Sequence, residues 1–225
     1  MGIVAHDLRN PLTAVQGFSE LILEDPDLDR AKIEEIAQRI SVTARRLTEM
    51  VQKLLDANAI ERGELKLNLA PCELSELTLS VAESHRRRAQ AKQQLLQVEN
   101  ATAPIMALLD RNLAVQIFEN LVSNAIKYSP PGKSIQVRLR REGENVRFEV
   151  QDEGPGLSAE DQKRLFGKFA RLSAKPTGGE NSTGLGLSIA KKMVEAMQGE
   201  IWCESEPDHG ATFVVQFREW RTTGT

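Results

Sequence analysis

Residues 120–128 read NLVSNAIKY, and the apolar residues in and around this stretch are spaced as on one face of a helix. Asn120, Asn124 and Lys127 recur at i, i+4 and i+7, so they share a second, polar face. Two amides and an ammonium group that project together suit a phosphate chain carrying Mg²⁺, because Mg²⁺ keeps several waters and takes few protein oxygens. A solvated polar stripe is the alternative interpretation of this segment taken alone.

Helices and strands alternate along the chain on both sides of this helix. Asp110 is a candidate N-cap for it, and the turn-rich residues 142–145 predict a hairpin connection. The dipeptide Ala70-Pro71 marks a boundary before these elements. Further helices are expected near 74–91, 159–166 and 187–197, and strands near 95–99, 105–109, 135–140, 146–151, 200–204 and 212–217. This order of elements predicts an α/β sandwich over residues 66–225.

The N-terminal part of the chain carries a different pattern. Within residues 33–57, apolar or small side chains follow a three-four alternation over more than three heptads. Residues 8–22 predict a shorter helix whose buried stripe includes Leu8 and Leu12, and which ends before the turn formers of residues 25–27. We therefore expect two antiparallel helices.

A helical hairpin of this size, residues 1–65, has a core too thin to stand alone. Its apolar stripe is expected to be covered by a second copy, which gives a four-helix bundle and a homodimer.

The composition is that of an ordinary globular protein, with 40% hydrophobic and 27% charged residues and a formal net charge of −3. This balance provides no field for a nucleic-acid backbone or an anionic membrane. No apolar run approaches the ~20 residues that span a bilayer, and the two distant cysteines support neither a disulfide framework nor a zinc site. We expect a cytoplasmic segment without membrane contact, whose parent protein could be membrane-attached through a missing N-terminal region.

Residues 6–12 read HDLRNPL, close to the start of the first predicted helix. Leu8 and Leu12 are assigned to the buried stripe, which leaves His6 on a different, solvated face. A neutral imidazole has one free lone pair and can act as a nucleophile, and a carboxylate that accepts from its other nitrogen stabilises the cation formed on attack. Asp7 is placed by the sequence to be that carboxylate. Taken alone, such a pair is more often an ordinary surface feature.

Two glycine-containing segments follow later in the chain. Residues 152–157 read DEGPGL directly after a predicted strand, and residues 184–187 read GLGL at the start of a predicted helix. Glycines let the backbone approach a ligand closely, and a helix N-terminus presents free N–H groups to anions. Each segment alone is more often a turn. Between them, residues 166–171 read FGKFAR and precede residues 173–183, which contain Gly, Ser and Asn and look like a mobile lid.

In order and separation, these segments resemble the H, N, G1, F and G2 boxes of two-component sensor histidine kinases, from His6 to about Phe217. Asp7 stands where glutamate is commoner. The resemblance implies an α+β fold with two domains: the dimerising hairpin, and a mixed sheet with helices on one face that is shared with gyrase and chaperone ATPases. It also implies that ATP phosphorylates His6, which then passes the phosphoryl group to an aspartate of a response regulator receiver domain.

The resemblance further implies roles for individual residues. Asn124 would coordinate Mg²⁺, with Asn120 and Lys127 near the metal and phosphates and Tyr128 beside the nucleotide. Asp152 would accept a hydrogen bond from the adenine amino group. The other residues expected around the base, the phosphates and the lid are Gly154, Gly156, Arg171, Gly184, Leu185, Gly186 and Thr212.

Asn120 separates a kinase from the hydrolases of this fold, which place a glutamate there as general base for water. An amide cannot take that proton, and Glu119 lies about 100° around the helix. Slow hydrolysis and transfer to His6 are therefore expected, while Asn10 would help to position water for phosphatase action on the partner. Two alternatives remain: an ATP-binding signalling module without transfer activity, and an ATP-driven conformational machine.

Overall fold

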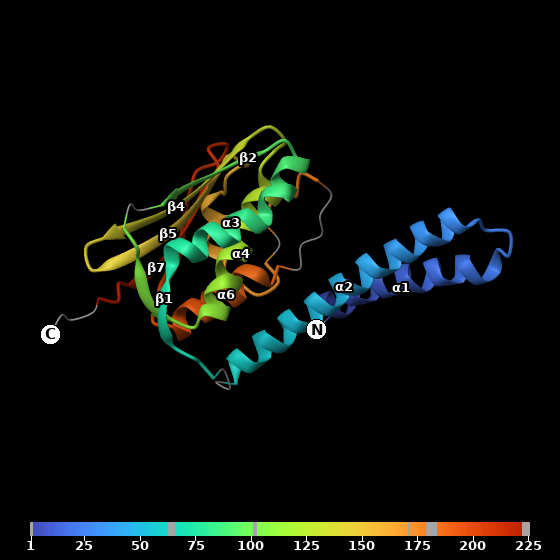
Figure 1. Cartoon of the computed structure of the whole chain (residues 1–225), viewed down its shortest axis with the longest axis horizontal. Helices are drawn as coiled ribbons and strands as arrows, with labels where there is room; N and C mark the ends of the chain where they lie inside the picture. Colours follow the sequence, from blue (N-terminus) through green and yellow to red (C-terminus); the bar gives the residue numbers. More distant parts are fainter. Residues whose placement is uncertain (1, 63–65, 101–102, 171, 179–183, 222–225) are drawn as a thin grey trace. The chain divides into compact units, whose positions relative to one another are not determined.

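The computed structural model describes residues 2–62, 66–100, 103–170, 172–178 and 184–221 of the chain. The chain divides into two compact units, residues 1–64 and 65–225, each with its own set of elements (Figure 1). The first unit is a helical hairpin, and the second contains a sheet with helices. The predicted α+β class is confirmed. Within the described residues, no helix has the length and apolar character needed to cross a bilayer.

Two helices, α1 (Gly2–Glu24) and α2 (Arg30–Glu61), run antiparallel in the first unit (Figure 1). The break between them lies at the Asp-Pro-Asp turn, as predicted. Asp29 caps α2, because its carboxylate accepts from the backbone N–H of Lys32 at 2.7 Å. Ile36 is buried in the hairpin, at 4% exposure, and most described residues of the predicted stripe are half-buried.

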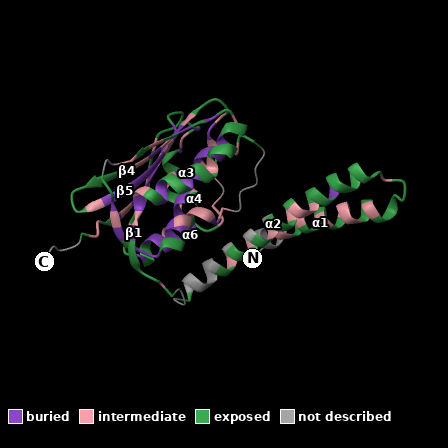
Figure 2. Ribbon diagram, in the orientation of Figure 1, coloured by how far each residue is buried: buried purple, intermediate pink, exposed green. Residues whose placement is uncertain are grey.

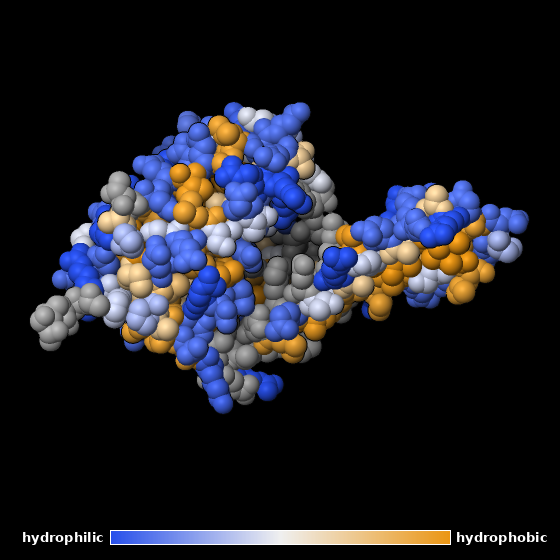
Figure 3. Space-filling model, viewed as in Figure 1, coloured by the Kyte–Doolittle hydropathy of each residue, from blue (hydrophilic) through white to orange (hydrophobic). Residues whose placement is uncertain are grey.

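Leu12, which the sequence assigns to the apolar stripe, is not covered within a single chain. It is 59% exposed, whereas Leu8 is half-buried, because α2 covers only one side of α1. Figure 3 shows apolar surface along the hairpin in orange. Among the described side chains of this unit, the other exposed large apolar residues are Leu21, Leu23, Ile33, Val42, Val51 and Leu55. Exposed apolar surface of this extent is typical of protein–protein contacts.

A five-stranded mixed sheet in the order β2-β4-β5-β7-β6 forms the second unit's centre. Its strands are β2 (Leu95–Asn100), β4 (Ser134–Glu142), β5 (Asn145–Asp152), β6 (Glu200–Ser205) and β7 (Ala211–Arg218). β2 pairs with β4 in parallel, and the other pairs are antiparallel. Apolar and polar residues alternate along β4 and β5, so one face of the sheet is apolar and the other carries polar side chains.

Three helices cover the apolar face of this sheet (Figures 1 and 2). They are α3 (Leu74–Ala91), α4 (Arg111–Tyr128) and α6 (Gly186–Ala196); a short helix, α5 (Ala159–Arg164), precedes α6 in the chain. Phe118 of α4 stacks on Phe148 of β5 with ring centroids 3.6 Å apart, and both side chains are buried. The core therefore lies between helices and sheet, and the predicted mixed sheet with helices on one face is confirmed.

A further strand occupies the place where the sequence predicts a boundary. β1 (Ala70–Glu73) includes Ala70-Pro71 and pairs antiparallel with β3 (Met106–Leu109). Four residues are too few to show a strand period, and proline is tolerated only because this two-stranded sheet consists of edge strands. The sequence analysis therefore misses β1, and the division between the two units lies a few residues before Ala70-Pro71, after residue 64.

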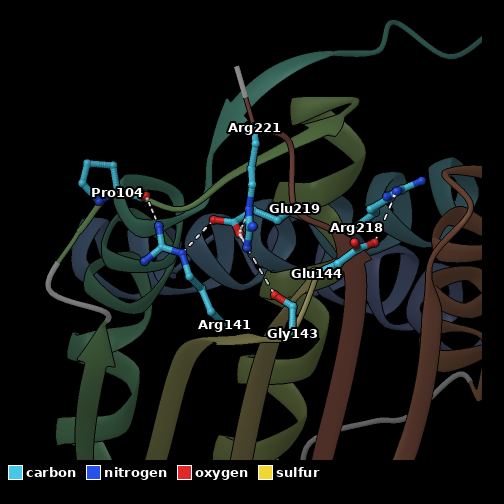
Figure 4. Close-up of polar contacts among 7 residues, drawn as sticks. All are labelled: Pro104, Arg141, Gly143, Glu144, Arg218, Glu219 and Arg221. Atoms are coloured by element: carbon cyan, nitrogen blue, oxygen red, sulfur yellow. Dashed lines mark hydrogen bonds and ion pairs between the residues drawn. The ribbon is translucent and has the colours of Figure 1, made fainter. Parts of the chain in front are cut away.

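The C-terminal residues after β7 connect the two sheets (Figure 4). The backbone N–H of Trp220 donates to the carbonyl of Met106 at 2.8 Å. The carboxylate of Glu219 accepts from Nε of Arg141 at 2.7 Å and from Nε of Arg221 at 2.8 Å. The hydrogen bond from Arg141 is the main cause that lowers the pKa of Glu219. These ionised side chains thus hold residues 219–221 against the β4–β5 hairpin.

Candidate functional site

Helix α4 carries the amides that the sequence singles out. Its start is defined by Asp110, whose carboxylate accepts from the backbone N–H groups of Asn112 and Leu113 at 3.0 and 3.2 Å, as predicted for an N-cap. Away from the core, Nδ2 of Asn124 donates to Oδ1 of Asn120 at 3.4 Å. The two amides therefore lie side by side, both half-buried.

The amide nitrogen of Asn120 is buried and has no hydrogen-bond partner among the described residues. The site is tight, because a Cβ at Gly186 would lie 2.5 Å from Oδ1 of Asn120. Glycine at this position lets the first turn of α6 contact the asparagine. A buried donor without a partner is costly in a folded protein, and a polar ligand can satisfy it.

The last turn of α4 carries Lys127 and Tyr128. Lys127 is only 7% exposed, and its Nζ lies 5.3 Å from the centroid of the Tyr128 ring. The loop after β5 contacts the same turn, since a Cβ at Gly154 would lie 3.1 Å from the carbonyl oxygen of Tyr128. The end of α4 and the end of β5 are thus neighbours.

Asp152 is the buried carboxyl at the end of β5, at 5% exposure. Its Oδ1 accepts from the backbone N–H of Gly154 at 2.8 Å, and the N–H of Ala211 also donates to the carboxyl. Burial raises the pKa of Asp152 to about 6, and the two hydrogen bonds offset this only in part. At neutral pH the group is a buried anionic acceptor, which suits an amino group of a ligand. A pKa this far from its ordinary value is typical of functional sites.

Gly156 is required by the packing of two loops. It has φ of 68°, and a Cβ there would lie 1.9 Å from the carbonyl oxygen of Glu206. The backbone N–H of Asp208 donates to the carbonyl of Pro155 at 2.8 Å in the same contact. The space above Gly156 that the sequence analysis assigns to a ligand is therefore filled, on the side of the missing Cβ, by the β6–β7 turn.

Thr212 does not join the Asp152 side of the sheet. In the register of β5 and β7, Asp152 pairs with Ala211, and Thr212 pairs with Gln151. Paired residues point to the same face and successive residues alternate, so Thr212 lies on the polar face. The β7 residue beside Asp152 is Ala211, which corrects the expectation for Thr212.

Residues 172–178, the start of the predicted lid, are tied to the rest of the unit. Ser173 donates from its backbone N–H and its hydroxyl to the carboxylate of Asp161. The hydrogen bond from the Ser173 hydroxyl lowers the pKa of Asp161. The backbone N–H of Thr177 donates to the last turn of α4 at 3.0 Å. Sequence reasoning missed these contacts, because isolated Ser, Thr and Asp residues give no signal before the chain folds.

The far end of this connection packs closely at the start of α6. Gly184 has φ of 66°, and a Cβ there would lie 2.9 Å from the backbone of Phe169. Leu185 is buried, and its carbonyl accepts the N–H of Ile189 at 3.0 Å, which opens α6. Arg171 and residues 179–183, which the sequence analysis places near the phosphates and in the lid, lie outside the described residues.

The predicted nucleophile lies in the first unit. His6 and Asp7 belong to helix α1, and their side chains lie outside the described ones. Asn10 follows one turn later and is exposed to solvent.

A mixed sheet covered on one face by helices, with adjacent asparagines on one helix and a buried aspartate near its end, defines the ATPase class shared by gyrases, chaperones and histidine kinases. Family models agree with this assignment. Residues 109–221 match the histidine kinase-, DNA gyrase B-, and HSP90-like ATPase family, and residues 1–63 match the His Kinase A (phospho-acceptor) domain. The chain belongs to the sensor histidine kinases and corresponds to their catalytic core.

Individual relatives extend this result. The sensor-like histidine kinase SenX3 of Mycolicibacterium smegmatis is 30% identical over 217 residues, which cover 96% of this chain and 56% of that protein. Full-length ShkA in complex with AMPPNP is 25% identical, with a TM-score of 0.74 over 95% of this chain and 44% of that one. ThkA in complex with the response regulator TrrA shares the fold, at 24% identity and a TM-score of 0.70 over 96% of this chain and 60% of that one. The chain thus spans about half the length of such relatives.

Proposed function

We propose that this chain transfers the γ-phosphate of ATP to His6 and then passes it to an aspartate of a response regulator. One observation carries the proposal: a single chain contains a phospho-acceptor segment that includes His6 and an ATPase segment with a buried acceptor, Asp152. Residues 1–65 would form the dimerisation and phosphotransfer domain, and residues 66–225 the catalytic ATP-binding domain.

The first step is an in-line displacement. A lone pair of the His6 imidazole attacks the γ-phosphorus, an N–P bond forms, and the bond to the bridging oxygen breaks, so ADP leaves with that electron pair. Asp7 accepts a hydrogen bond from the other ring nitrogen and stabilises the positive charge that develops there. In the second step, the phosphoryl group moves from His6 to a carboxylate oxygen of the partner.

The nucleotide would be held by groups near the ends of α4 and β5. Asp152 would accept from the adenine amino group, Tyr128 would lie beside the nucleotide, and Lys127 would approach its phosphates. The buried, unpartnered nitrogen of Asn120 fits a phosphate oxygen or a metal-bound water. The backbone and side chains that would shape the site are those of Gly154, Gly156, Arg171, Gly184, Leu185 and Gly186.

A magnesium ion fits this donor set. Nδ2 of Asn124 donates to Asn120. The amide oxygen of Asn124 therefore points away from Asn120 and would be the hard ligand for the metal. When bound, Mg²⁺ would neutralise charge on the phosphates. Among the described residues, no group of three or more His, Cys, Asp and Glu could hold a metal.

Asn120 favours transfer over hydrolysis. Its amide cannot act as a general base for water, and Glu119 is exposed on a different side of α4. Water is therefore a poor attacking group at this site, and the His6 imidazole is the better nucleophile for the γ-phosphate.

Two kinds of partner are proposed. The exposed apolar residues of the hairpin support a homodimer, since a second copy would cover them. A response regulator receiver domain is supported by ThkA, which has been solved in complex with its response regulator TrrA. With such a partner, the exposed Asn10 would position water for removal of the phosphoryl group.

The experiment is label transfer. Incubating the full chain with γ-labelled ATP and Mg²⁺ should yield acid-labile, base-stable phosphate, lost in His6→Ala and retained in His85→Ala, which removes a histidine of α3 as the matched control. Equal labelling of His6→Ala would refute the proposal. Nucleotide binding without any labelling would favour the alternative, an ATP-binding signalling module that lacks transfer activity because Asp7 replaces the commoner glutamate.

A further inference from the structure

Side chains from the turn after α3 converge on the last turn of α4. Nζ of Lys92 donates to the carbonyl of Ile126 at 2.8 Å, and Nε2 of Gln94 donates to the carbonyls of Ile126 and Ser129 at 3.1 and 2.7 Å. The last carbonyls of a helix have no partner within it, and a cation near them is favoured by the helix dipole. These two residues therefore cap α4.

Thr177, from the segment between α5 and α6, adds a second set of bonds to the same turn. Its N–H donates to the carbonyl of Lys127 at 3.0 Å, and its hydroxyl donates to the carbonyl of Ser129 at 2.7 Å. The hydroxyl also accepts from Nζ of Lys92 at 2.7 Å. A hydroxyl has one donor and two acceptor sites, so Lys92, Thr177 and Ser129 form a continuous chain of hydrogen bonds.

Capping alone does not explain this arrangement. The N–H of Thr177 caps the carbonyl of Lys127, but its hydroxyl donates to the carbonyl of Ser129, which Gln94 already satisfies. The preceding Ser173 is held separately by Asp161. The segment 172–178 is consequently fixed at two points, one of them on the turn that carries Lys127 and Tyr128.

We propose that Thr177, held by Lys92, is a positioning residue that sets nucleotide affinity by fixing residues 172–178 against the end of α4. This inference rests on the proposed function, because Lys127 and Tyr128 are assigned there to the nucleotide. If the tether is lost, the segment and the turn must be ordered when ATP binds, which weakens affinity.

The test is calorimetric titration of the full chain with ATP and Mg²⁺. Thr177→Val removes the hydroxyl at nearly constant shape and should raise the Kd about fivefold, the loss expected for one net hydrogen bond. Thr177→Ser keeps the hydroxyl and should stay within about twofold of wild type. Lys92→Met should raise the Kd at least as much as Thr177→Val, because it also removes the hydrogen bond to the carbonyl of Ile126. The double variant should be no weaker than Lys92→Met, since Thr177→Val acts through the same coupled chain of hydrogen bonds. Thr48→Val makes the same change at an exposed residue of α2 and is the matched control.

Two further readouts separate positioning from general stability. At saturating ATP, labelling of His6 by Thr177→Val should reach the wild-type rate, so only the KM rises. Without nucleotide, hydrogen exchange in the peptide across residues 172–178 should accelerate in Thr177→Val and not in Thr48→Val. Unchanged Kd and exchange, a Thr177→Ser variant as weak as Thr177→Val, or losses that add in the double variant would each overturn the inference. Faster exchange in a chain that binds no ATP would confirm the tether and refute the proposed function instead.

Discussion

Asp152→Asn should make the second unit more stable while it removes adenine recognition. The rise of the Asp152 pKa from 3.8 to about 6 corresponds to about 3 kcal/mol in favour of the protonated carboxyl. At pH 7.5 the native carboxyl is ionised and bears this cost. Asparagine is neutral and keeps one acceptor oxygen for the N–H groups of Gly154 and Ala211, although its buried NH₂ group costs about 1 kcal/mol. We expect a net gain of about 2 kcal/mol in the free energy of unfolding.

The difference in stability between Asp152→Asn and wild type should depend on pH, and this dependence identifies the Asp152 carboxyl as its cause. A native pKa above the unfolded value means that the folded state binds the proton more tightly, so wild-type stability falls as pH rises from about 4 to about 6. The advantage of Asp152→Asn should therefore be full above pH 6.5 and vanish as pH falls toward 4. Nucleotide binding by wild type should weaken as pH falls through about 6, because protonation removes the anionic acceptor.

Urea unfolding of the full chain, followed by tryptophan fluorescence, measures this difference. Trp202 and Trp220 both belong to the second unit, so the signal does not report on the hairpin. Asp161→Asn is the matched control, because the hydrogen bond from Ser173 lowers the pKa of Asp161. Loss of the Asp161 charge should therefore not stabilise the unit. An Asp152→Asn chain that is less stable than wild type at pH 7.5, or equally advantaged at pH 4.5, would refute the reasoning.

Two other predictions follow from the geometry of the site. Asn120→Glu supplies the general base that the site lacks, so phosphate release independent of His6 should rise about tenfold or more. Asn120→Gln keeps an amide and should release phosphate at the wild-type rate. If neither variant raises the rate, Asn120 does not face the reacting water. Gly156→Ala should destabilise the second unit by about 3 kcal/mol or more, since its Cβ would meet the Glu206 carbonyl at 1.9 Å and φ is 68°. Gly17→Ala, where nothing lies within 4 Å in helix α1, should be neutral or stabilising in circular-dichroism melts, and equal losses in both variants would contradict the steric argument.

Local chemistry made much of the fold predictable. Helix 74–91 was predicted with the bounds that α3 has, and Asp110 acts as the expected N-cap of α4, because periodicity and capping are short-range properties. β1 was missed, since four residues with a proline show no period. The exposure of Leu12 within one chain also could not be predicted, because a helical stripe does not reveal how much of it one partner helix covers.

For the candidate site, too, short-range features could be predicted and features that depend on distant partners could not. Spacing on one helix correctly brought Asn120 and Asn124 together. Alternation along β7, where Thr212 and Gln216 are less buried than their neighbours, also indicates the polar face for Thr212. The β7 residue that lies beside Asp152 depends instead on the pairing of β7 with β5, which the sequence of β7 alone does not give. Lys92, Asp161 and Thr177 could not be found at all, because their partners are backbone groups or side chains distant in sequence.

Three unusual features of the second unit belong to α4, β5 and α6. Asp152 is a buried carboxyl that is ionised at neutral pH, Asn120 has a buried amide nitrogen without a partner, and a Cβ at Gly186 would clash with Asn120. Each feature lowers stability if it serves packing alone, whereas a ligand with an amino group and anionic oxygens would satisfy the first two. Because such a ligand binds only the folded unit, saturating ATP should stabilise it by mass action. Asp152→Asn should be more stable than wild type without ATP, yet ATP should not stabilise it further. A poorly packed core would show the first result alone, whereas a binding site shows both.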